Sequence, residues 1–167
     1  DLDTSHKRVK ALEKTAEEIR RELLQTQQHQ DINQLKLKLS KSSTKELTQA
    51  AAKMEMPALA LTDHGVMFGI LHFYQAAQKA GIKAIAGCEI YISPREMTQK
   101  DVKFDTRPTH LILLAEDQTG YNNLMQIATA AQLEGFYYKP RVDKNFLSAH
   151  AEGLIALSSC GSGEVPR

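Results

Sequence analysis

The chain has 167 residues, of which 42% are hydrophobic and 25% charged, the balance of an ordinary globular protein. Its formal net charge of +1 excludes a global field that would draw it onto nucleic acid, so any DNA contact must be local or be made by a larger protein. Two cysteines exclude a disulfide framework, and no apolar run approaches the roughly 20 residues that a membrane helix needs. We therefore expect a reduced, cytoplasmic chain with no membrane partner, cut at both ends from a longer protein.

A break in composition divides the chain. Residues 1–56 contain no Gly, Pro or aromatic residue, and all nine Gly and all five Pro lie from Pro57 onward. Helical spacing marks an apolar seam made by Val9, Leu12, Ala16, Ile19 and Leu23. The Leu-Lys-Leu-Lys-Leu stretch at 35–39 alternates like a strand but also fits a helix, which we favour. We therefore expect residues 1–44 to be a helical extension that could be foreign or fused.

Helical and strand patterns alternate through the rest of the chain. The patterns predict helices at 45–54, 69–80, 118–132 and 142–149, with Gly81 ending the second. They predict strands at 57–61, 82–86, 89–92, 110–115 and 154–158, with a polar loop at 93–109. Alternation of this kind favours a parallel α/β sheet or barrel over residues 45–167.

Functional residues in such folds gather where strands end. Three polar stretches fit that rule: Asp63-His64, Cys88-Glu89 and Cys160 each follow a predicted strand. His110 starts its strand, so it fits the rule only if that strand runs in the opposite direction. Imidazole, carboxylate and thiolate are ligands for zinc or manganese. Each residue also has a plainer interpretation, because a single His is commonly a structural hydrogen-bonding residue and a single Cys a small buried one.

Several ordered motifs resemble the PHP domain (polymerase and histidinol phosphatase type) of bacterial DNA polymerase III alpha subunits. Met56-Pro-Ala-Leu-Ala-Leu-Thr-Asp-His-Gly65, Gly87-Cys-Glu-Ile-Tyr91 and His110-Leu-Ile-Leu-Leu-Ala115 resemble three successive signatures. Phe136-Tyr-Tyr-Lys-Pro-Arg141 is similar to the polymerase branch rather than to free-standing phosphatases. The resemblance covers residues 45–167, whereas residues 1–44 match nothing in the family.

The resemblance implies a fold, a site and partners. The fold would be a partial, distorted (β/α)7 PHP barrel preceded by the helical segment. His64, Glu89, His110 and Cys160 would be metal ligands for zinc or manganese, and Asp63 would orient His64. In active family members a metal-bound hydroxide attacks a phosphodiester as a 3′–5′ exonuclease. The partners would be the remainder of the alpha subunit, the proofreading subunit and, through the parent enzyme, DNA.

The chain also departs from the family pattern. The family opens with a His-x-His strand, where this chain has Leu35-Lys-Leu-Lys-Leu39, and its later Asp-x-His pair would lie past Arg167. With half of the ligand set missing, we expect weak or no metal binding and no hydrolysis. The polymerase palm would also lie far downstream, so the chain alone cannot polymerise. Two other hypotheses stay open: a free-standing PHP phosphoesterase, and a non-catalytic helical interaction module on a barrel remnant.

Overall fold

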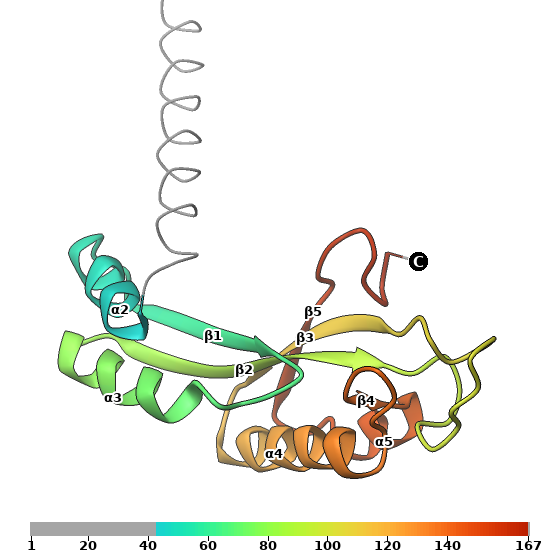
Figure 1. The fold of residues 1–167 in the computed structure, drawn as a ribbon. Helices are drawn as coiled ribbons and strands as arrows, with labels where there is room; N and C mark the ends of the chain where they lie inside the picture. The colour runs from blue at the N-terminus through green and yellow to red at the C-terminus, as the bar shows by residue number, and fades with distance from the viewer. Residues whose placement is uncertain (1–42, 167) are drawn as a thin grey trace, which may run out of the picture. The chain divides into compact units, whose positions relative to one another are not determined.

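The structure, a computed structural model, describes residues 43–166 (Figure 1). The predicted seam at 9–23, the stretch at 35–39 and nearly all of the expected helical extension lie outside the described residues. Among residues 43–166, no helix has the length and apolar character required to cross a bilayer.

The described residues form the mixed α/β fold that the sequence predicts. The elements in chain order are α2 (Thr44–Lys53), β1 (Ala58–His64), α3 (Ile70–Ala80), β2 (Lys83–Ile92), β3 (Thr109–Ala115), α4 (Gln118–Leu133), β4 (Arg141–Val142), α5 (Lys144–Ala149) and β5 (Leu154–Leu157). Local chemistry explains several boundaries. Gly81 ends α3 in the left-handed conformation, and Asp117 and Asp143 cap α4 and α5 by accepting hydrogen bonds from Gly120 N and Phe146 N.

The sheet is mixed, which corrects the expectation of a parallel sheet. Its strand order is β1-β2-β3-β5, with the short β4 beside the end of β2. β1 and β4 run parallel to β2, whereas β3 is antiparallel to both β2 and β5. The connection from β2 to β3 contains no helix, and a parallel return would have needed a crossover of that kind. The described strands form an open sheet, so the seven-stranded barrel stays a prediction.

β2 is one continuous strand, although the sequence predicts two strands interrupted at Gly87-Cys88. Gly87 is buried, and a Cβ atom there would lie 2.7–2.8 Å from Leu114, the Leu113 carbonyl and Thr62. This glycine therefore permits neighbouring strands to approach closely and does not mark a turn. Likewise, β1 extends through the predicted loop residues to His64, where it pairs with Glu89.

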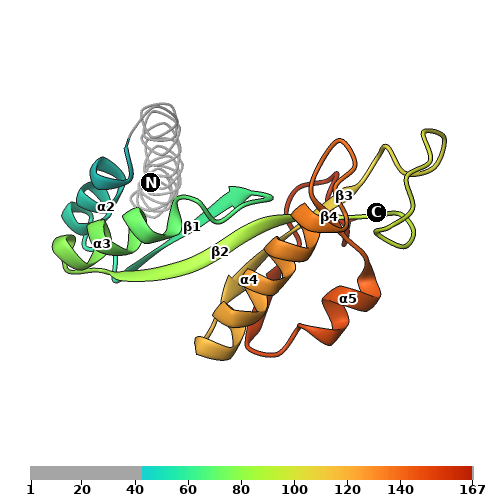
Figure 2. The same cartoon turned by 60° about the horizontal axis from the view of Figure 1, so that its bottom comes forward.

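The core lies between the sheet and α4. Cys88, Ile90 and Ile92 of β2 pack in one cluster with Leu111 and Leu113 of β3 and with Leu124 and Ile127 of α4, among others. α3 lies on the same side of the sheet as α4 (Figures 1 and 2). Because side chains alternate along a strand, the opposite face carries Glu89 and Tyr91, which are only half-buried. Within residues 43–166, the fold thus leaves a second, partly exposed face on which polar side chains can meet.

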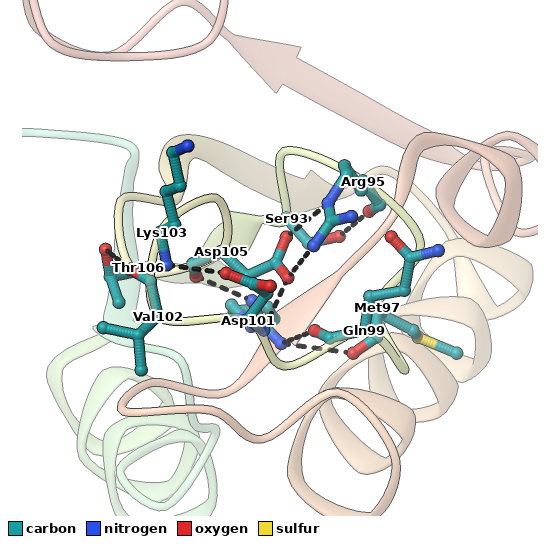
Figure 3. A network of polar contacts seen from close by, with 10 residues as sticks. Ser93, Arg95, Met97, Gln99, Asp101, Val102, Lys103, Asp105 and Thr106 are labelled. Carbon is teal, nitrogen blue, oxygen red and sulfur yellow. Dashed lines mark hydrogen bonds and ion pairs between the residues drawn. The ribbon is translucent and has the colours of Figure 1, made fainter.

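A buried arginine organises the long loop between β2 and β3. Arg141 is fully buried, and its guanidinium donates to the carbonyls of Gly135, Asp105, Met97 and Gln99 at 2.9–3.2 Å. Within the loop, Arg95 pairs with both carboxylate oxygens of Asp105 (Figure 3). That hydrogen-bonded pair lowers the pKa of Asp105. The segment predicted simply as a polar loop is therefore held in a defined conformation.

Candidate metal centre

The strand register places three expected ligands on one face of the sheet. His64 of β1 stands opposite Glu89 of β2, and His110 of β3 stands opposite Tyr91, two residues beyond Glu89. Directly paired residues point to the same side of a sheet, and residues two apart along a strand do so as well. His64, Glu89, Tyr91 and His110 therefore share the face that α4 leaves open. The antiparallel direction of β3 brings its first residues, including His110, beside the end of β2.

The first contact joins β1 and β2. His64 Nε2 lies 3.4 Å from Glu89 Oε2, with the His64 side chain 71% exposed and that of Glu89 17% exposed. The Glu89 carboxylate is thus largely covered, whereas the His64 imidazole beside it is exposed to solvent. Gly65 follows with a φ of 69° and donates its N–H to the Glu89 carbonyl at 2.8 Å. This turn keeps the end of β1 against β2 and holds the two side chains together.

The second contact joins β3 to the turn after β5. Cys160 Sγ lies 3.3 Å from His110 Nε2 and 3.1 Å from Ser162 Oγ. Ser159 redirects the chain in the left-handed region, with a φ of 66°. A non-glycine residue in that region carries strain of about 1–2 kcal/mol, and such strain is characteristic of functional turns. The turn thereby brings a thiol to an imidazole fifty positions earlier in the chain.

The two cysteines have opposite electrostatic environments. Hydrogen bonds from Ser162, followed by His110, lower the pKa of the exposed Cys160 thiol to about 7. Burial raises the pKa of Cys88 to about 11, and its thiol donates to the carbonyls of Val66 and Asp63 on the core side of the sheet. Cys160 is therefore suited to act as a thiolate near neutral pH, whereas Cys88 is a structural residue.

We expect iodoacetamide to alkylate Cys160 in the native chain and to leave Cys88 unmodified. The alkylation rate should rise with pH and reach half of its plateau near pH 7, because the thiolate is the reacting form. Ser162→Ala should move this midpoint to higher pH, since it removes the largest stabilisation of the thiolate. Peptide mass spectrometry across a pH series measures both sites. Equal modification of both cysteines in the folded chain would contradict the assignment.

The types of donor atom suit zinc or manganese, but the number of donors that stand together is too small. The separations of 3.3 and 3.4 Å match the distance of about 3.3–3.6 Å between two ligands on one tetrahedral ion. Each pair offers only two donors, whereas a protein site uses three or four. Within residues 43–166, no three His, Cys, Asp or Glu side chains stand close enough to hold one ion together. The structure thus places the four expected ligands as two separate pairs, and their role as metal ligands stays a prediction.

Asp63 has a different immediate partner from the one expected. It pairs in register with Cys88, and its carboxylate accepts a hydrogen bond from Gly69 N at 2.9 Å. A Cβ atom on Gly69 would lie 2.8 Å from that carboxylate, so the glycine permits the contact. Asp63 therefore shapes the turn between β1 and α3, and its role in orienting His64 stays a prediction.

The sequence patterns did not predict three neighbours of these pairs, Tyr91, Lys139 and Ser162. Tyr91 stands between the two pairs, and Lys139 Nζ lies 4.3 Å from the centre of its ring. The alternation from Glu89 to Tyr91 could have indicated the first, because both positions share a face of one strand. No local pattern indicates Lys139 or Ser162, since both contacts depend on how loops fold.

Comparisons with known proteins place this chain in a family. The model of the PHP domain family matches residues 34–167, so the match includes residues 34–44, which the motifs alone left outside the resemblance. The DNA polymerase III subunit alpha of Treponema pallidum is 50% identical over 126 residues, covering 75% of this chain and 11% of that protein. The Chlamydia trachomatis protein of the same name is 46% identical over 124 residues, covering 74% and 10%.

A third relative shows a similar match. The DNA polymerase III subunit alpha of Thermus aquaticus is 48% identical over 115 residues, covering 68% of this chain and 9% of that protein. The chain therefore spans about a tenth of the length of these curated relatives. It belongs to the PHP domain family, and its PHP region is homologous to that of bacterial DNA polymerase III alpha subunits.

Proposed function

We propose that this chain serves as the PHP portion of a replicative DNA polymerase III alpha subunit and acts in DNA replication in the cytoplasm. Identity of 44–50% to several alpha subunits over 115–126 residues supports the assignment. Its partners are then the remainder of the alpha subunit, the proofreading subunit and, through the assembled enzyme, DNA. Polymerisation would belong to that larger protein, because this chain spans only about a tenth of the length of the alpha subunits that it matches.

The flanking coding sequence tests this role directly. We expect the DNA that follows the Arg167 codon in the source genome to encode a polymerase body in the same reading frame. A stop codon with no polymerase reading frame nearby would contradict the role. In that case, chelator-sensitive turnover of a generic phosphomonoester by the purified chain would favour a free-standing PHP phosphoesterase.

Within that role, we propose a vestigial metal-dependent 3′–5′ exonuclease site on the open face of the sheet. This proposal depends on the observation that two pairs, His64–Glu89 and His110–Cys160, each containing an imidazole, lie on this single face. When bound there, zinc or manganese would supply an activated water and charge stabilisation for phosphodiester hydrolysis. Glu89 and Cys160 would contribute the anionic donors, and the two histidines would contribute neutral nitrogens.

The incomplete donor set predicts weak or no metal binding by the purified chain and no measurable hydrolysis. Titration calorimetry with Zn²⁺ and Mn²⁺ should show weak binding at most, and His64→Ala or Glu89→Ala should reduce any binding at least tenfold. Removing a side chain that only supports a metal ligand commonly lowers metal affinity about 10–100-fold, so removing a ligand itself should cost at least as much. His72→Ala is the matched control, because His72 is an exposed residue of α3, outside this face. Tight stoichiometric binding that both ligand variants abolish would show a complete site and contradict its vestigial character.

A further inference from the structure

Glu164 joins three separate parts of the fold near the second pair. One carboxylate oxygen lies 2.5 Å from Lys144 Nζ at the start of α5, and the other accepts a hydrogen bond from the Thr109 hydroxyl at the start of β3. Its backbone N–H donates to the His110 carbonyl at 2.9 Å. The Glu164 side chain is 25% exposed, so these contacts are partly shielded from solvent. Both the side chain and the backbone of this residue therefore tie the C-terminal turn to β3.

The turn that carries Cys160 has little apolar packing to hold it. Ser158, Cys160, Gly161 and Ser162 are all exposed. Gly163 is buried, and its N–H donates to the Cys160 carbonyl at 2.7 Å, which links Cys160 to the residue beside Glu164. Exposed segments without buried side chains open at small energetic cost unless polar contacts restrain them. Glu164 restrains this turn through three contacts: its N–H bond to the His110 carbonyl, the hydrogen bond from the Thr109 hydroxyl and the ion pair with Lys144.

We propose that Glu164 is a positioning residue, which holds Cys160 against His110 by fastening the C-terminal turn to Thr109 and Lys144. The functional meaning of this step rests on the proposed function, in which His110 and Cys160 are ligands. The geometry itself does not depend on a metal ion. The Glu164 N–H bonds to the His110 carbonyl and its carboxylate contacts Thr109 and Lys144, so it acts through the backbone that carries the thiol and the imidazole.

A double-mutant cycle, measured by the NMR signals of the His110 ring, tests the proposal in the metal-free chain of 167 residues. Cys160→Ala should change the ring chemical shifts of His110 in labelled protein, because the thiol lies 3.3 Å from Nε2. In a Glu164→Ala background, the same change should fall to less than half, since the thiol has already left the ring. The ring signals of His64 serve as the control for an intact fold. An undiminished effect of Cys160→Ala in the Glu164→Ala background would overturn the proposal.

Two milder variants keep the test decisive should Glu164→Ala fail to fold. Glu164→Gln keeps an acceptor for Thr109 but removes the charge, and Lys144→Met removes the charged partner at a side chain that is 72% exposed. We expect intermediate losses of the His110–Cys160 coupling in both. Full coupling in both variants would contradict the role of the ion pair and, with it, the proposal.

Cobalt(II) separates this proposal from the proposed metal site. The wild-type chain with excess Co²⁺ should show a thiolate-to-cobalt absorption band that Glu164→Ala weakens several-fold. No cobalt binding by the wild-type chain would count against the metal site alone, while the mutant cycle would still decide the role of Glu164. A band of equal strength in both proteins would overturn the positioning role.

Discussion

Replacing Arg141 with methionine is expected to lower the free energy of unfolding by about 3–5 kcal/mol. The guanidinium is fully buried and donates to four carbonyl groups, three of them in the loop between β2 and β3. Methionine fills similar volume but leaves those carbonyls without their donors, and each unsatisfied buried group costs about 1–3 kcal/mol before relaxation. Urea unfolding followed by far-ultraviolet circular dichroism measures the loss.

Arg95→Met is the matched control for Arg141→Met. Arg95 also contacts Asp105, but its side chain is 42% exposed, so solvent screens this ion pair more than it screens the buried contacts of Arg141. Asp105 keeps a hydrogen bond from Asp101 N at 2.8 Å in this variant. We expect a clearly smaller loss of stability than for Arg141→Met. Equal losses would mean that the ion pair, rather than the buried network of carbonyl contacts, maintains the loop.

Gly120→Ala is expected to destabilise the fold by about 3 kcal/mol or more, because no side chain fits between α4 and the turn before β5. A Cβ atom at Gly120 would lie 1.7 Å from the Gly153 carbonyl oxygen, which is backbone and cannot rotate away. The helix would have to move from the turn and would strain the cap in which Asp117 accepts from Gly120 N. Thermal unfolding of the variant should show a strongly reduced midpoint or no folded baseline.

Gly161→Ala is the control for the backbone entropy that any glycine replacement changes. A Cβ atom there meets nothing within 4 Å, so the stability change should stay within about 0.5 kcal/mol. A loss at Gly161 as large as that at Gly120 would contradict a steric origin. The comparison also bears on the candidate site, because β5 begins at the Gly120–Gly153 contact and leads directly to Cys160.

Most helices and strands, and the family, followed from the sequence alone, whereas the single strand β2 and the short strand β4 did not. Helices α3, α4 and α5 end or begin at Gly81, Asp117 and Asp143, and such caps act through contacts within a few residues. The motifs around His64, Glu89 and His110 identified the PHP family before any coordinates, because residue identity at ordered spacing is a property of the chain itself.

The tertiary structure decided how those motifs meet. Local periodicity carries no information about strand direction or register, so the antiparallel β3, the continuous β2 and the shared face of His64, Glu89 and His110 all depended on pairing between distant segments. The burial of Arg141 and the tie from Glu164 to Lys144 also depended on loops meeting across the fold. The sequence therefore determined which donor groups the chain carries, and long-range packing determined that they stand as two pairs.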